Sequence, residues 1–222
     1  MDEIEQYYCK IEEKYKKYCA YFDHKIIEDI PNKIFVDKDF ASLREYCVFR
    51  MGFSVVTRNN CRILAQIINH ENVLEIMCGL GSYSATLASL GVNIIPTDNM
   101  SWMDYETSKY KNWKRNSWCT AIECLDAVQA IKKYGKNVGY ILMSWPPQHE
   151  NFALDALLTM RKVNPACRMI YIGERKGGCT ANDEFFDEAI DVSDEYLEIR
   201  ELRESYHAWL NNDYHDLQFI MR

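Results

Sequence analysis

The hydrophobic positions along the chain change period from one short segment to the next. Apolar runs typical of buried strands occur at 73–75, 92–97, 138–143 and 168–174. The segments between these runs place apolar residues three or four positions apart, as at Tyr83, Leu87 and Leu90. Strand-like runs that alternate with helical segments indicate an α/β fold with a mostly parallel sheet covered on both faces.

Three further runs extend the predicted sheet to seven strands. One is expected at 118–122, and two close the chain at 196–202 and 216–221. No helical pattern separates the last two runs. We therefore expect them to form an antiparallel hairpin at the C-terminal edge of the sheet.

The N-terminal part of the chain follows a helical period. Between residues 3 and 23, apolar side chains recur every three or four positions, with Lys and Glu between them. This pattern predicts an amphipathic helix that packs either as a flank on the core or as a cover over a substrate or partner. We predict two units, a helical extension over 1–50 and an α/β domain over 51–222.

Composition and charge exclude several classes of protein. The chain has 222 residues, 48% of them hydrophobic, and a net charge of −7, which argues against a protein that mainly holds a phosphate backbone. Its nine cysteines include no Cys-x-x-Cys pair, and no His cluster lies beside them, so no metal site is predicted. No secretory signal or apolar run of about 20 residues is visible, and we expect a cytoplasmic or nuclear protein with reduced thiols.

A glycine-rich turn follows the first predicted strand. That strand carries Glu75 and leads into Gly79 and Gly81, and the next strand ends at Asp98. Glycines let a backbone approach a ligand closely, and a carboxylate can accept hydrogen bonds from both hydroxyls of a ribose. The order of strand, glycine turn, helix, strand and acid predicts an adenosine-containing cofactor. The alternative is structural: Glu75 braces the turn and Asp98 caps the next segment.

Three residue sets give the chain a family resemblance. Glu75 with Gly79 and Gly81, then Asp98, and finally Ser144-Trp-Pro-Pro147 together resemble the class I S-adenosylmethionine-dependent methyltransferases over about residues 50–222. Gly52-Phe-Ser54, the Trp-Pro-Pro motif and the loop from Gly173 to Phe186 resemble a narrower group of methyltransferase-like proteins. The resemblance implies a Rossmann-like methyltransferase fold and S-adenosylmethionine as the cofactor. It does not supply a substrate.

The resemblance also implies which residues would hold the cofactor. They are Glu75, Gly79, Gly81 and Asp98, with Ser54 reaching over the methionine end and Glu123 flanking the adenine. The third glycine of the NAD fingerprint would fall at Ser84. Its absence favours S-adenosylmethionine over NAD, and an NAD(P)-dependent oxidoreductase remains an alternative.

Trp145, Pro146 and Pro147 follow the fourth main strand, at the edge where open α/β sheets bind ligands. Family members that modify amines carry Asn or Asp before the two prolines. An indole donates a hydrogen bond but cannot accept one, which argues against methylation of an adenine or glutamine nitrogen. Trp145 is therefore expected to form an apolar or cation–π wall, unless it is simply a core residue.

Two further residues are candidates for acid–base roles. Glu174 ends a strand at the same edge and either positions a substrate amine, acts as a general base, or pairs with a neighbouring Arg or Lys in solvent. His149 is a candidate acid or base, although a loop histidine is often incidental. Four aromatic and four basic residues in the loop 102–115 are suited to nucleic acid, but the acidic chain favours other acceptors.

The sequence thus predicts methyl transfer from S-adenosylmethionine to an unidentified acceptor, a small molecule or protein rather than nucleic acid. A methyltransferase-like protein that only binds is the alternative, since no hydrogen-bond acceptor precedes the prolines.

Overall fold

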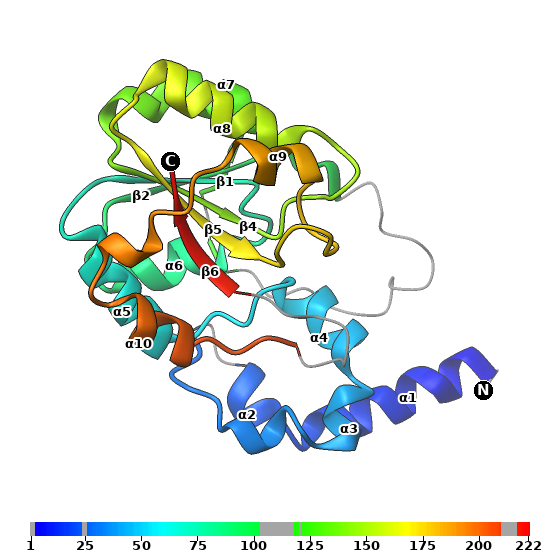
Figure 1. Cartoon of the computed structure of the whole chain (residues 1–222). Coiled ribbons are helices and arrows are strands. Elements are labelled where there is room, and N and C mark those ends of the chain that lie inside the picture. The colour runs from blue at the N-terminus through cyan, green and yellow to red at the C-terminus, as the bar shows by residue number, and fades with distance from the viewer. Residues whose placement is uncertain (1–2, 24–25, 103–117, 120, 210–216) are drawn as a thin grey trace.

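The computed structural model of the chain describes residues 3–23, 26–102, 118–119, 121–209 and 217–222. Its described residues form one six-stranded sheet in the order β3-β2-β1-β4-β5-β6 (Figure 1). The strands are β1 (Val73–Ile76), β2 (Ile94–Asp98), β3 (Glu123–Cys124), β4 (Tyr140–Ser144), β5 (Arg168–Gly173) and β6 (Leu217–Met221). Neighbouring strands are parallel except β5 and β6, which are antiparallel. The predicted α/β fold with an antiparallel C-terminal edge is confirmed.

Helices cover both faces of the sheet (Figure 1). One face carries α5 (Arg58–Ile68), α6 (Ser82–Ser89) and α10 (Ile199–Glu204), and the other carries α7 (Ala127–Tyr134), α8 (Phe152–Val163) and α9 (Asp183–Glu188). In β4, Ile141 and Met143 pack toward α7 and α8, whereas Tyr140 and Leu142 pack toward α5. Because both faces are buried, the strands read as continuous apolar runs rather than as alternating ones.

The predicted strand at 196–202 is wrong. Its second half belongs to α10, which is preceded by the 3-10 turn η4 (Ser193–Glu195). Its packed residues Tyr196, Ile199 and Leu202 recur every three positions, which is a helical spacing. The described residues therefore form six strands rather than the predicted seven.

Residues 190–192 take the place at the outer edge of β6 that a seventh strand would occupy. The Ile190 amide donates to the Arg222 carbonyl at 3.1 Å, the Arg222 amide donates back at 3.0 Å, and the Val192 amide donates to Ile220 at 2.8 Å. Three residues are enough to cover part of this edge, which would otherwise expose unpaired backbone groups.

The third strand also differs from its prediction. β3 is confined to two residues, with Glu123 beside Thr97 and Cys124 beside Asp98. Trp118, expected inside this strand, is buried instead among the aromatic side chains of the N-terminal helices. The burial of Trp118 therefore reflects packing against the N-terminal helices rather than strand pairing.

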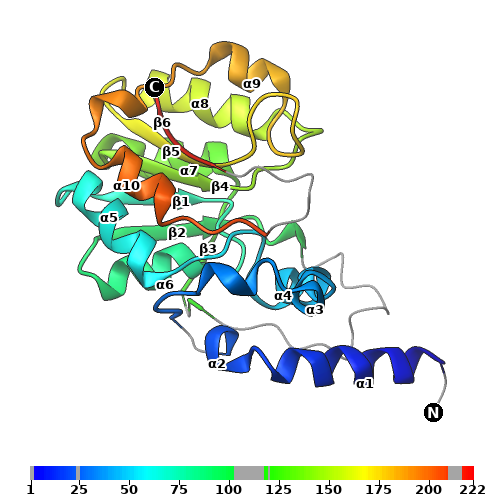
Figure 2. The same ribbon diagram turned by 60° about the horizontal axis from the view of Figure 1, so that its bottom comes forward.

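The N-terminal helices form a separate aromatic cluster beneath the sheet in Figure 2. They are α1 (Glu3–Lys16), α2 (Cys19–Phe22), the 3-10 turn η1 (Asn32–Ile34), α3 (Lys38–Ala41) and α4 (Arg44–Met51). Phe22 stacks on Phe40 at 5.3 Å and on Trp209, from the C-terminal part of the chain, at 6.0 Å between ring centroids. The division of the chain at residue 50 stays a prediction.

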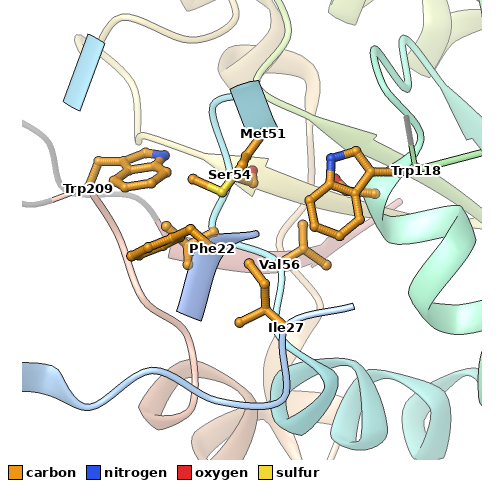
Figure 3. Close-up of a pocket in the computed structure, with 9 residues that line it drawn as sticks. Phe22, Ile27, Met51, Ser54, Val56, Trp118 and Trp209 are labelled. Atoms are coloured by element: carbon orange, nitrogen blue, oxygen red, sulfur yellow. The ribbon is translucent and has the colours of Figure 1, made fainter. Parts of the chain in front are cut away.

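A small cavity lies where these helices meet the rest of the chain. Trp209 and Trp118 lie on opposite sides of it, with Phe22, Met51 and Val56 between them (Figure 3). Its volume of about 10 Å³ is room for roughly one water molecule. The junction is therefore packed closely and is not a ligand site.

Within the described ranges, the structure contains no helix that is both long and apolar enough to cross a membrane.

Candidate functional site

A larger cavity opens at the carboxyl ends of β1, β2 and β4. It has a volume of about 250 Å³ and is lined by Met77 after β1, Asp98 at the end of β2 and Trp145 after β4. Val48 and Met51 of α4 also line it, so the N-terminal helices contribute to its wall. In this strand order β1 lies between β2 and β4, and the crevice beside such a switch point is where open α/β sheets bind ligands.

The cavity brings together about half of the residues that the sequence singled out. Those that line it are Ser54, Glu75, Gly79, Asp98, Trp145 and Pro147. Those that lie outside its lining are Gly81, Glu123, Pro146, His149 and Glu174. The first group comes from four separate segments that meet only in the folded chain.

Asp98 ties the glycine turn to the end of β2. Its side chain is 4% exposed, and Oδ2 accepts a hydrogen bond from the Gly79 amide at 2.8 Å. Oδ1 accepts from the Met100 amide at 2.6 Å and from the Trp102 indole at 3.1 Å. Burial raises the pKa of this carboxyl group, and the three hydrogen bonds oppose the rise by favouring the ionised form.

Glu75 braces the start of α6 from inside the core. Its side chain is 2% exposed, and Oε2 accepts hydrogen bonds from the Ser84 hydroxyl and, at 3.0 Å, from the Ser84 amide. Burial raises the pKa of Glu75 to about 8, although both Ser84 hydrogen bonds act in the opposite direction. Glu75 therefore joins strand, turn and helix and also faces the cavity.

The two glycines of the turn serve different purposes. Both have left-handed backbones, with φ of +54° at Gly79 and +71° at Gly81. A Cβ at Gly79 would meet no atom within 4 Å, whereas a Cβ at Gly81 would lie 2.7 Å from the Cβ of Cys119. Gly79 thus leaves open space at a residue that lines the cavity, and Gly81 permits close packing against Cys119.

Alanine substitutions at these two glycines form a matched pair. We expect Gly81→Ala to lower the free energy of unfolding by about 2–4 kcal/mol, since backbone strain and the collision with Cys119 add. Gly79→Ala should cost about 1 kcal/mol, from backbone strain alone. Urea titrations of both variants measure the difference. Equal losses of unfolding free energy would contradict the different roles given to the two glycines.

Two stacked aromatic rings form one wall of the cavity. The rings of Phe53 and Trp145 stack with centroids 5.1 Å apart and planes 16° apart. The residues beside them, Ser54 and Ser144, are joined by a hydrogen bond of 2.6 Å between their hydroxyl oxygens. This bond links two segments 90 positions apart, each of which contributes one of the stacked rings.

Trp145 lines the cavity and has a strained backbone conformation. Its φ is +52°, a conformation that is rare for a bulky residue and is held only where surrounding contacts enforce it. The Trp145 amide donates to the Ile172 carbonyl of β5 at 2.8 Å, and the Pro146 carbonyl accepts from the Ala181 amide at 3.1 Å. Neighbouring segments therefore hold the backbone of Trp145 and Pro146 in this conformation.

The remaining candidates face other parts of the molecule. Glu174, which is 5% exposed, accepts a hydrogen bond from the Cys179 amide at 2.5 Å and so holds the turn that follows β5. Glu123 accepts hydrogen bonds from Lys133 and Tyr134, both at 2.5 Å, and these bonds lower its pKa. His149 is exposed on the surface.

Thr180 lies between Glu174 and the start of α9. It does not cap this helix, because Asn182 accepts the capping hydrogen bond from the Phe185 amide at 3.1 Å. The Thr180 hydroxyl accepts instead from the Glu174 amide at 2.8 Å. It therefore belongs to the same turn as Glu174.

Several lining residues were not among the predicted site residues, including Met77 and Phe152. Trp102 was named only as an aromatic residue of the loop 102–115, although its position four residues after Asp98 was a signal for a place in the site. The rest of the aromatic and basic loop, 103–117, lies outside the described residues. In the described part of the chain, no group of three or more His, Cys, Asp or Glu side chains could hold a metal ion.

No protein-family model and no curated protein matches the chain. One similar solved structure is the 1,6-didemethyltoxoflavin-N1-methyltransferase of Burkholderia thailandensis with bound 1,6-didemethyltoxoflavin and S-adenosylhomocysteine, which is 11% identical. The match covers 74% of this chain and 78% of that one, with a TM-score of 0.38.

Two further solved structures match nearly the whole chain. The magnesium protoporphyrin IX methyltransferase of Synechocystis PCC 6803, with bound S-adenosylmethionine, is 12% identical over 94% of this chain and 97% of that one (TM-score 0.41). A protein from Pyrococcus horikoshii OT3 is 14% identical over 95% and 98% (TM-score 0.41).

Proposed function

We propose that the chain transfers a methyl group from S-adenosylmethionine to a small-molecule or protein acceptor. The observation that carries this proposal is the meeting of the Gly79 turn, the Asp98 carboxylate and the Phe53–Trp145 wall around one cavity. An acid beside an open glycine turn suits an adenosyl group, because the backbone leaves space and the carboxylate can accept from ribose hydroxyls.

The residues divide between the two ends of the cavity. Glu75, Gly79 and Asp98 would hold the donor, which supplies an activated sulfonium methyl group when bound. At the other end, Trp145 and Phe53 would confine the acceptor, orient it toward the donor and exclude water. Glu174 and His149 have no part in this proposal, because neither lines the cavity.

A protein that binds the donor without transferring its methyl group is the second candidate. It is favoured by the chemistry of Trp145, whose indole cannot accept a proton from an acceptor nitrogen. The NAD(P)-dependent oxidoreductase is less well supported, because the position of the third fingerprint glycine holds Ser84, whose hydroxyl bonds to Glu75.

Calorimetry followed by a turnover assay separates the three candidates. We expect heat on titration with S-adenosylmethionine and with S-adenosylhomocysteine, and none with NAD. Incubation with methyl-labelled S-adenosylmethionine and pools of metabolites or proteins should then release S-adenosylhomocysteine. Binding without release from any pool favours the binding protein. No heat with either adenosyl ligand would refute the proposal.

A further inference from the structure

Asp98 has used most of its hydrogen-bonding capacity within the protein. A carboxylate offers about four acceptor positions, two on each oxygen. The contacts of the described residues fill both positions on Oδ1, through the Met100 amide and the Trp102 indole. The Gly79 amide fills one on Oδ2. A single position is therefore left for a ligand, whereas the two hydroxyls of a ribose require two.

The three donors to Asp98 differ in how easily they can be released. The Gly79 and Met100 amides belong to the backbone of two turns, and φ is +54° at Gly79 and +59° at Met100. Withdrawing either amide requires the backbone to rearrange. The Trp102 indole is the donor that a side-chain rotation can remove, and its bond to Asp98 is also the longest of the three, at 3.1 Å.

A displacement of the Trp102 side chain would affect the cavity directly. This side chain is partly buried and lines the same cavity as Asp98 and Gly79. A rotation of the indole away from Asp98 would free the second acceptor position. The same rotation would change the shape of the cavity beside the carboxylate.

We propose that Trp102 is a displaceable donor that occupies Asp98 in the ligand-free protein and gives way to a ribose hydroxyl. Trp102 thereby sets the affinity of the site for adenosyl ligands, as a positioning residue that acts through Asp98. This inference rests on the proposed function, since it takes the ligand of Asp98 to be the ribose of S-adenosylmethionine.

The substitution Trp102→Phe tests the proposal, because the two possible roles of the indole predict opposite changes in affinity. Phe keeps an aromatic ring but has no N–H, so the free variant leaves one acceptor position of a buried carboxylate unfilled. A displaced indole contributes nothing to the bound state. The variant should therefore bind S-adenosylhomocysteine more tightly, by about tenfold or more, the effect of one hydrogen bond to a charged group. An indole that stays on Asp98 as a supporting donor predicts weaker binding instead.

The experiment is calorimetry with S-adenosylhomocysteine on the wild type, Trp102→Phe and Trp209→Phe. Trp209 is the matched control because it is buried in the N-terminal cluster, 5.7 Å from Phe40 between ring centroids. Its substitution should leave the affinity unchanged. In parallel, fluorine NMR of wild-type protein labelled with 5-fluorotryptophan follows the indoles directly, with each variant assigning its own resonance. The Trp102 resonance should shift on binding and the Trp209 resonance should not.

The outcomes are distinguishable. Unchanged or weaker binding by Trp102→Phe overturns the inference while the proposed function stands. A Trp102 resonance that does not move at saturating S-adenosylhomocysteine also overturns the inference. This measurement uses wild-type protein, so it remains a test even if the Trp102→Phe variant does not fold. Absence of any heat with the wild type refutes the proposed function, and this inference with it.

Discussion

Replacing Asp98 with Asn is expected to weaken the binding of S-adenosylhomocysteine by about a hundredfold or more. Asn keeps the shape of the side chain but loses the charge, and its amide group would face one of the donors that now bond to Asp98. Hydrogen bonds to a charged group contribute about 1.5–3 kcal/mol each, so losing the acceptor for a ribose diol accounts for a change of this size. Calorimetry measures it.

The matched control is Asp37→Asn. Asp37 caps α3 by accepting from the Asp39 amide at 2.9 Å and takes no part in lining the cavity. This variant should keep wild-type affinity. Because Asp98→Asn also disturbs buried donors, its fold is checked by circular dichroism before titration. Wild-type affinity in a folded Asp98→Asn protein would show that the ligand is not held through this residue.

Replacing Glu75 with Gln should change how stability depends on pH. In the unfolded chain this carboxyl group ionises near its ordinary pKa of 4.5, but burial keeps it protonated in the folded protein up to about pH 8. Between these values the folded state binds more protons than the unfolded state. Wild-type stability therefore falls as pH rises through this window, by up to about 1.4 kcal/mol per pH unit from this group.

The amide side chain introduced by Glu75→Gln would remain neutral, so the stability of the variant lacks this contribution. The difference in free energy of unfolding between Glu75→Gln and wild type should grow in favour of the variant from about pH 4.5 to about pH 8, by several kcal/mol. Urea titrations across that range measure it. Ser84→Ala removes a hydroxyl that favours the ionised form and should extend the window to higher pH. Parallel curves for wild type and Glu75→Gln would exclude a raised pKa.

The sequence was sufficient for the parts of the site that follow directly from strand order. Glu75 and Asp98 lie on neighbouring parallel strands, and the carboxyl ends of such strands meet at one edge of a sheet. The turn between them needed left-handed residues, which the two glycines indicated. The hydrophobic period of a segment and the residues that a turn requires depend on neighbouring positions in the sequence, so these features could be predicted without the structure.

The direction in which a side chain points, and the donor that it bonds to, could not be predicted in the same way. Glu174 ends a strand at the correct edge, yet its carboxylate turns into its own loop and accepts from Cys179. Glu123 pairs with Lys133 across β3 and α7. Each outcome depends on which donor lies nearest in the fold, and a side chain at a strand end has several directions open to it. The helix at 199–204 was missed for a related reason, since a short apolar run fits either period.

The sequence by itself determined the class of the fold, the mostly parallel sheet and the approach of an acid to a glycine turn. Only the tertiary structure decided how this edge is enclosed. It placed α4 over the cavity, stacked Phe53 on Trp145 and brought the Trp102 indole onto Asp98. The physical reason is range: periodicity and turns arise from neighbours in the chain, whereas the walls of the cavity arise from contacts such as the one between Ser54 and Ser144, 90 positions apart.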